Sequence, residues 1–225
     1  TAEARNISRR SFPDGFVFGV SSSGYQYEGA VKEDGRGQIW FVVTGKISDG
    51  SNADVANDHY HKYPEDIQLM KDLRVDAFRF SIAWSRIYPN GTGEVNRAGV
   101  DHYNDVIDKL LANGITPYVT LYHWDLPQGL QDRHKGWLST RIIRDFARFA
   151  ETCFEEFGDR VKHWTTLNEP HIFSIFAYDL GLSAPGRCSF SICKAGNSLT
   201  EPYIVAHNLL LSHAAVVQLY NAKFK

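Results

Sequence analysis

Four short apolar runs, each followed by a longer stretch with helical spacing, constrain the fold of this chain more than any other feature. The runs span residues 16–20, 77–82, 117–122 and 161–167. Their length and apolar character are typical of buried strands. A chain that repeats a strand and then a helix predicts parallel strands covered by helices, because a parallel connection needs a crossover and the crossover is usually helical.

The stretches between and after the runs carry apolar residues at three- and four-residue intervals, which predicts four amphipathic helices. They lie within residues 60–73, 100–111, 142–157 and 203–220. Gly114 is placed to end the second helix, and Ser139 and Gly158 to begin and end the third. Cys153 falls on the apolar face of the third helix, so we expect a buried thiol.

Two architectures fit this alternation: an open doubly wound sheet and a closed eight-fold barrel. An open nucleotide-binding sheet would place a Gly-x-Gly-x-x-Gly motif after the first strand, and only a partial match, Gly35-Arg36-Gly37, occurs well past it. We therefore predict an α/β fold of the (β/α)8 TIM-barrel type. The strand starts are about 49 residues apart, so eight units would need roughly 390 residues. Residues 1–225 then form one partial barrel domain with the first four units, and the carboxy-terminal half comes from sequence outside the chain or from a complementing chain.

Composition excludes several kinds of partner. The net charge is −2 and no segment concentrates Lys and Arg, which argues against nucleic acid. No run of eighteen apolar residues occurs, so no membrane span is expected. Aromatic residues make up 13% of the chain, which suits both a packed core and a surface that stacks on ring-shaped ligands.

Polar and aromatic side chains gather where the predicted strands end. Gln26 follows the first strand, Arg79 lies within the second, His123 and Trp124 end the third, and Asn168 and Glu169 end the fourth. In parallel barrels functional groups collect at the carboxyl ends of the strands, so these residues are expected to share one site. Such a mixture of hydrogen-bonding groups and aromatic faces suits a polyhydroxylated ring.

Each of these residues also has a structural interpretation when taken alone. His123 beside Asp125 is compatible with a structural histidine, Arg79 with half of a buried ion pair, and Trp124 with core packing. Their shared position at one end of successive strands favours a ligand site. Metal binding is not expected, because His59-x-His61 has no third ligand at a recognisable spacing. A serine hydrolase is not expected either, since no Gly-x-Ser-x-Gly occurs.

Six segments in order resemble glycoside hydrolase family 1, in the style of the plant β-glucosidases. They are residues 12–19, 25–29, 33–37, 78–86, 120–125 and 166–170. The resemblance implies an O-glycosidase that hydrolyses O-linked β-glucosides with retention, through a covalent glycosyl-enzyme intermediate and without a cofactor. The expected partner is a small-molecule β-glucoside.

Carried over position by position, the resemblance implies a role for each residue at the strand ends. Glu169 would be the general acid/base, and Asn168 would hold the sugar 2-hydroxyl. Gln26 and His123 would bind hydroxyls on the far side of the glycone, with Trp124 in the same substrate site. Arg79 would support the nucleophile. That nucleophile is a Glu in a Thr-Glu-Asn-Gly-like motif, which these 225 residues do not contain, so the fragment alone is expected to be inactive.

Two other functions remain open at this stage. Residues 37–41 depart from the family pattern by apparent loss of a Ser or Thr and an Asp, which is compatible with an inactive member that binds or stores carbohydrate. A transglucosidase would use the same site residues and differ only in the acceptor.

Three features predict a secretory route. Cys188 and Cys193 are five positions apart in a Gly- and Ser-rich segment and are predicted to pair in an oxidising compartment. Asn6 and Asn90 each begin an Asn-x-Ser/Thr acceptor for N-glycosylation. The organelle and the oligomeric state are not specified by the sequence.

Overall fold

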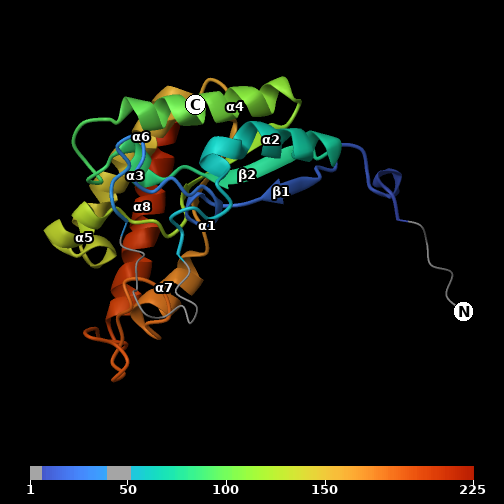
Figure 1. The fold of residues 1–225 in the computed structure, drawn as a ribbon. Coiled ribbons are helices and arrows are strands. Elements are labelled where there is room, and N and C mark those ends of the chain that lie inside the picture. Colours follow the sequence, from blue (N-terminus) through green and yellow to red (C-terminus); the bar gives the residue numbers. More distant parts are fainter. Residues whose placement is uncertain (1–6, 40–51) are drawn as a thin grey trace, which may run out of the picture.

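The computed structural model describes residues 7–39 and 52–225, and at its centre is a four-stranded parallel sheet (Figure 1). The strands are β1 (Gly19–Ser21), β2 (Ala77–Ser81), β3 (Thr116–Tyr122) and β4 (His163–Leu167). Their spatial order follows the chain, and all three pairings are parallel. The predicted alternation is confirmed. The first strand begins later than predicted, because Phe16 and Phe18 pack with Phe12 in an aromatic cluster that precedes it.

Four long helices alternate with the strands as predicted. They are α2 (His59–Asp72), α4 (Arg97–Ala112), α6 (Arg141–Phe157) and α8 (Glu201–Lys223). Helices α2 and α4 lie along the same side of β1 and β2 (Figure 1). The predicted apolar face of α6 is buried, with Phe146, Phe149 and Phe157 fully inaccessible. The core therefore lies between the helices and the sheet.

The three predicted helix ends lie near the observed ones. Gly114 follows α4 with φ +73°, the left-handed conformation that glycine adopts without steric cost. Helix α6 begins at Arg141, whose backbone N–H donates to the Ser139 hydroxyl at 3.3 Å, and its C-cap is Gly158. Local sequence therefore determines where these two helices end.

Short helices that the periodicity did not predict follow each strand. They are α1 (Gly24–Tyr27), α3 (Trp84–Ile87), α5 (Gln128–His134) and α7 (Pro170–Tyr178), with 3₁₀ turns at Arg9–Ser11 and Gly136–Leu138. Elements of one to three turns carry too few residues for a reliable period. The four short helices form the rim beyond the carboxyl ends of the strands, whereas the Arg9–Ser11 turn precedes β1.

The two outer strands of the sheet each have one neighbour among the described residues. All three residues of β1 are exposed, whereas β2 is almost entirely buried. Beside β4, a groove of about 450 Å³ is lined by Trp164, Thr166, His213, Val217 and Tyr220, among others. Unpaired edges with adjacent apolar surface are what four units of a closed barrel leave open.

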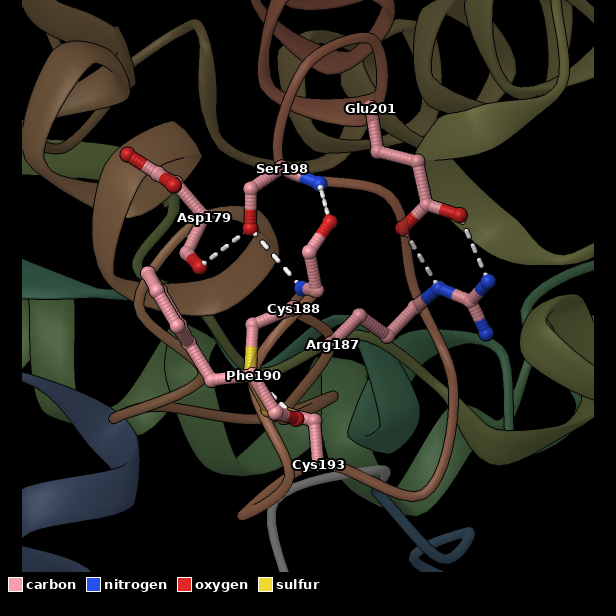
Figure 2. Close-up of a disulfide and its surroundings, with 8 residues drawn as sticks. Asp179, Arg187, Cys188, Phe190, Cys193, Ser198 and Glu201 are labelled. Carbon is pink, nitrogen blue, oxygen red and sulfur yellow. Dashed lines mark hydrogen bonds and ion pairs between the residues drawn. A yellow bond between two sulfur atoms is a disulfide. The ribbon is translucent and has the colours of Figure 1, made fainter.

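The predicted pair of cysteines is joined, and Cys153 is free and buried on α6. The Cys188–Cys193 loop is tied to the start of α8 by Arg187, which donates to both carboxylate oxygens of Glu201 at 2.6 and 2.8 Å (Figure 2). The Ser198 hydroxyl donates to the backbone carbonyl of Asp179 at 2.8 Å. The disulfide loop is thus anchored on both sides.

Among the described residues no helix has the length and apolar character to cross a membrane. Of the two acceptor asparagines, Asn90 is exposed, and Asn6 lies outside the described residues. Trp40 and Phe41, where the sequence departs from the family pattern, also lie outside them.

Candidate active site

A cleft of about 510 Å³ opens at the carboxyl ends of the strands. All six residues predicted to share a site line it, together with two that were not predicted. The full set is Ser23, Tyr25, Gln26, Arg79, His123, Trp124, Asn168 and Glu169. Residues separated by more than 140 positions meet here because the strands that carry them are parallel and adjacent.

Arg79 connects three strands across the floor of the cleft. Its Nη2 donates to Asn168 Oδ1 at 2.7 Å, and its Nε donates to Thr120 Oγ1 at 3.0 Å. No carboxylate of the described chain forms a salt bridge with Arg79. Its positive charge is therefore available to an anion in the cleft, rather than being half of a buried ion pair.

Asn168 is held by its backbone as well as by its side chain. Its N–H donates to the Tyr122 carbonyl and its carbonyl accepts from Trp124 Nε1, both at 2.9 Å. Only 9% of Asn168 is exposed. A side chain fixed in this way loses little conformational entropy when a ligand binds.

Glu169 and Trp124 both adopt left-handed backbone conformations, with φ of +45° and +72°. Such conformations are uncommon for residues other than glycine and cluster at functional sites. Pro170 follows Glu169 directly and cannot donate a backbone hydrogen bond. The structure adds that Pro170 begins α7, with Glu169 as its N-cap residue. The exposed Glu169 carboxyl reaches the cleft from this turn.

His123 is a neutral hydrogen-bonding group in this cleft. Burial, and then the positive charge of Arg79, lower the pKa of His123 from 6.5 to about 4. Its Nδ1 is buried and has no hydrogen-bond partner among the described residues. A neutral imidazole can both donate and accept, which suits a hydroxyl ligand.

Asp125 does not line the cleft, although it follows His123 and Trp124 in the sequence. The carboxyl is fully buried and neither oxygen has a hydrogen-bond partner within the described chain. Burial raises the pKa of Asp125 to about 6, and the nearby Arg36 opposes the shift. The Asp125 carboxyl therefore makes no hydrogen bond to the His123 ring.

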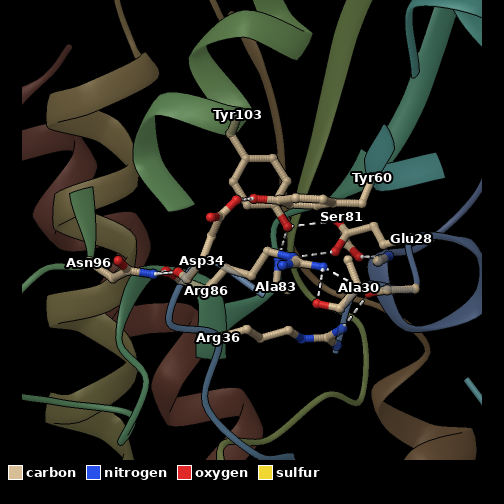
Figure 3. Close-up of polar contacts among 12 residues, drawn as sticks. Glu28, Ala30, Asp34, Arg36, Tyr60, Ser81, Ala83, Arg86, Asn96 and Tyr103 are labelled. Carbon is tan, nitrogen blue, oxygen red and sulfur yellow. Dashed lines mark hydrogen bonds and ion pairs between the residues drawn. The ribbon is translucent and has the colours of Figure 1, made fainter. Parts of the chain in front are cut away.

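A buried polar network lies behind the wall of the cleft formed by α1 (Figure 3). Glu28 accepts from Arg86 Nε and from the Tyr103 hydroxyl, both at 2.7 Å. Arg86 also donates to the Gly29 carbonyl at 2.9 Å, and its guanidinium lies 4.0 Å from the centre of the Tyr60 ring. Sequence reasoning did not identify this network, because its members are distant in the chain and ordinary in type.

His59 and His61 hold no common ligand position. His59 contacts Asp66 at 2.6 Å, whereas His61 contacts Asp58 at 2.6 Å and Glu33 at 2.9 Å. No group of three or more His, Cys, Asp and Glu residues with metal-binding geometry occurs in the part of the chain that the structure describes.

Comparison with known proteins identifies related enzymes. The family model described as glycosyl hydrolase family 1 matches residues 8–225. Beta-glucosidase 6 of Oryza sativa subsp. japonica is 67% identical over 97% of this chain and 43% of its own length. Beta-glucosidase 40 of Arabidopsis thaliana is 61% identical over 100% of the chain and 46% of its own length. The chain thus spans slightly less than half of each relative.

Solved structures agree with the sequence relatives. The rice Os3BGlu6 β-glucosidase superposes with a TM-score of 0.95 at 67% identity, covering 97% of this chain and 47% of that one. A Glu-to-Gln mutant of the same rice enzyme, in a covalent complex with Glc, also superposes with a TM-score of 0.95. The family 1 β-glucosidase of Thermotoga maritima superposes with a TM-score of 0.87 at 43% identity, covering 94% of this chain and 46% of that one. The four strand-helix units are therefore part of a (β/α)8 barrel, as predicted, and the chain belongs to glycosyl hydrolase family 1.

Proposed function

We propose that this chain supplies the acid/base half of the active site of a retaining β-glucosidase that acts on O-linked β-glucosides. The observation that carries the proposal is the position of Glu169. Its carboxyl lies in one cleft with the buried amide of Asn168 and the guanidinium of Arg79. A glycosidase needs a proton donor at the leaving oxygen and positive charge near an attacking carboxylate, and the cleft offers both.

In this proposal the reaction has two steps. Glu169 protonates the glycosidic oxygen while a carboxylate from outside this chain attacks the anomeric carbon, which breaks the glycosidic bond and releases the aglycone alcohol. Glu169, now ionised, then takes a proton from a water molecule while the oxygen of that water attacks the same anomeric carbon. That attack frees glucose and the nucleophile, and it returns the proton to Glu169.

The remaining side chains bind the sugar and the nucleophile. Asn168 would hold the hydroxyl next to the anomeric carbon, and Gln26 and His123 would bind hydroxyls on the far side of the ring. Trp124 would form part of the same wall. Arg79 would pair with the nucleophile. The carboxyl of the nucleophile would lie about 5–5.5 Å from that of Glu169. The covalent complex of the rice enzyme with Glc supports a glycosyl intermediate at this fold.

Glu169→Gln in the complete protein tests the acid/base role. We expect turnover of glucosides with poor leaving groups to fall by about 10²–10⁴-fold, because protonation is lost. Activated aryl glucosides need no protonation and should lose much less in the glycosylation step. Rates measured over a series of leaving-group pKa values check this. Glu65→Gln, on the exposed face of α2, is the matched control, and equal losses on all substrates would contradict the role.

A second experiment tests where the nucleophile resides. A 2-fluoro glucoside that traps the glycosyl intermediate should add one sugar mass to the complete protein and none to residues 1–225 alone, as read by intact mass spectrometry. Labelling of the 225-residue chain would place the nucleophile within it. Absence of labelling and of turnover in the complete protein would instead favour a carbohydrate-binding protein. Product partition with an added alcohol separates hydrolysis from transglucosylation.

We further infer a secretory route for the protein. The support is the Cys188–Cys193 pair and the exposed Asn90 acceptor. A disulfide of this kind persists in oxidising compartments, and an exposed asparagine is accessible for glycosylation.

A further inference from the structure

The segment that carries Gln26 contains an unused helix-capping pattern. Ser23 and Gln26 are in the Ser-x-x-Gln arrangement of a capping box at the start of α1. In a capping box the serine hydroxyl and the glutamine side chain each bond to the other residue's backbone. Both side chains would then be used to satisfy the helix terminus.

The structure diverts both side chains from that use. Ser23 is at the N-cap position with extended backbone, φ −141° and ψ 151°, yet its side chain makes no capping hydrogen bond. Its hydroxyl instead donates to the side-chain oxygen of Gln26, Oε1, at 2.7 Å. Both residues line the cleft, Ser23 as a buried residue and Gln26 as an exposed one. The hydrogen bond therefore runs from a buried hydroxyl in the cleft wall to an exposed amide beside it.

Helix α1 does not depend on that missing cap. A four-residue helix is unstable by itself, so contacts from other elements must hold it. The Gly24 N–H donates to the buried Ser81 hydroxyl at 2.8 Å. At the other end Glu28, which is 2% exposed, is fixed by Arg86 and Tyr103 (Figure 3). The backbone of α1 is thus secured from β2, α3 and α4, which leaves the Ser23 hydroxyl free for Gln26.

We propose that Ser23 is a positioning residue that sets the amide orientation of Gln26. Because the Ser23 hydroxyl donates to Oε1, the amide nitrogen of Gln26 faces the cleft with its two hydrogens. Gln26 then meets a ligand as a hydrogen-bond donor, and its partner is a sugar oxygen that accepts. The inference rests on the proposed glycosidase function and assigns to Ser23 a part in it that does not require contact with the substrate.

A double-mutant cycle in the complete protein tests the inference. The variants are Ser23→Ala, Gln26→Ala and the two combined, with kcat/KM measured on 4-nitrophenyl β-glucoside. Ser23→Ala should lower kcat/KM by about 3- to 10-fold, the range of one neutral hydrogen bond. In the Gln26→Ala background the same change should cost less than about twofold, because no amide remains to be oriented. A merely structural role of Ser23 would not produce this dependence on Gln26.

Ser212→Ala is the matched control, since Ser212 is a fully buried serine on α8 whose hydroxyl has no hydrogen-bond partner among the described residues. It should leave kcat/KM unchanged. Gln26→Glu keeps an acceptor for Ser23 but removes the donor to the sugar, so it should lose at least as much activity as Gln26→Ala.

The outcomes separate this inference from the proposed function. Equal losses from Ser23→Ala in both backgrounds, or no loss in either, would overturn the positioning role. Full activity in Gln26→Glu would overturn the donor orientation. If Gln26→Ala itself leaves kcat/KM unchanged, the sugar-binding role of Gln26 in the proposed function fails, whatever Ser23 does.

Discussion

At the residue scale, the cleft combines two residues of unusual backbone conformation with a neutral histidine and a positively charged arginine. Glu169 and Trp124 have left-handed backbone conformations, and Trp124 Nε1 donates to the Asn168 carbonyl between them. His123 stays neutral because the lowered pKa of about 4 keeps a proton off its ring near neutral pH. The positive charge on the floor of the cleft is therefore that of Arg79, which suits an anionic nucleophile beside it.

The lowered pKa of a second histidine, His102, predicts that the fold loses stability in acid. Burial lowers the pKa of His102 from 6.5 to about 4, with Glu28 opposing and Arg86 and His59 reinforcing the shift. The unfolded chain takes up this proton below about pH 6.5, whereas the folded chain does so only near pH 4. Its contribution to stability is thus present above pH 6.5 and is lost as the pH falls towards 4.

His102→Gln should reduce that loss, because glutamine does not titrate. The measurement is the urea midpoint at pH 7 and at pH 4.5 for the parent and the variant. His207→Gln, at an exposed histidine on α8, is the control and should keep the parent's dependence. An unchanged difference between the two pH values in His102→Gln would contradict the assignment.

At the scale of elements, α3 and α4 pack so closely that only glycine fits at their contact. A Cβ added at Gly99 of α4 would lie 2.2 Å from the Arg86 carbonyl of α3. Arg86 is also the partner of Glu28. The position of α4 therefore determines how well the buried network behind the cleft is formed.

Gly99→Ala should destabilise the protein although alanine favours helix. We expect a loss of about 1–3 kcal/mol in the free energy of unfolding, the usual range for overpacking. Asp101→Ala, on the exposed face of the same helix, lacks the close contact and should be nearly neutral. Chemical denaturation of both variants checks this. A stabilised Gly99→Ala would show that α4 shifts without cost.

The long elements were predictable because each has a complete apolar period and a local signal for its end. Helix α6 illustrates this, with a buried face from Ile142 to Phe157 and Gly158 as its C-cap. The short helices α1, α3, α5 and α7 were not predictable from periodicity. Their positions depend on contacts such as that between Gly24 and Ser81, which join residues 57 positions apart.

At the scale of the whole molecule, the open edges of the sheet dominate the behaviour expected of residues 1–225 alone. Strand β1 is exposed, and its Val20 is 37% accessible. Unpaired edges and apolar surface favour self-association. In a complete barrel, further strand-helix units would cover the same surface.

Val20→Lys should therefore improve the behaviour of residues 1–225 alone and harm the complete protein. In residues 1–225 alone it should raise the monomeric fraction, measured by light scattering after gel filtration, because a charged edge disfavours pairing. In the complete protein it should lower stability, because the lysine would be buried in the barrel. Leu73→Lys, at the 70% exposed C-cap position of α2, is the control and should change neither the monomeric fraction nor the stability. Improved stability of the complete protein would contradict the barrel interpretation of this edge.

The sequence alone determined the order of the four strands and the four long helices, the barrel class and the six cleft residues at the strand ends. These follow from local periodicity and from the rule that parallel strands present their carboxyl ends on one side. Only the tertiary structure decided how the side chains are used. It turned Ser23 and Gln26 from a capping pair into an oriented amide, directed Asp125 into the core and paired Arg79 with Asn168. Hydrogen-bond partners depend on distances between segments far apart in the chain, and such distances are set only when the core packs.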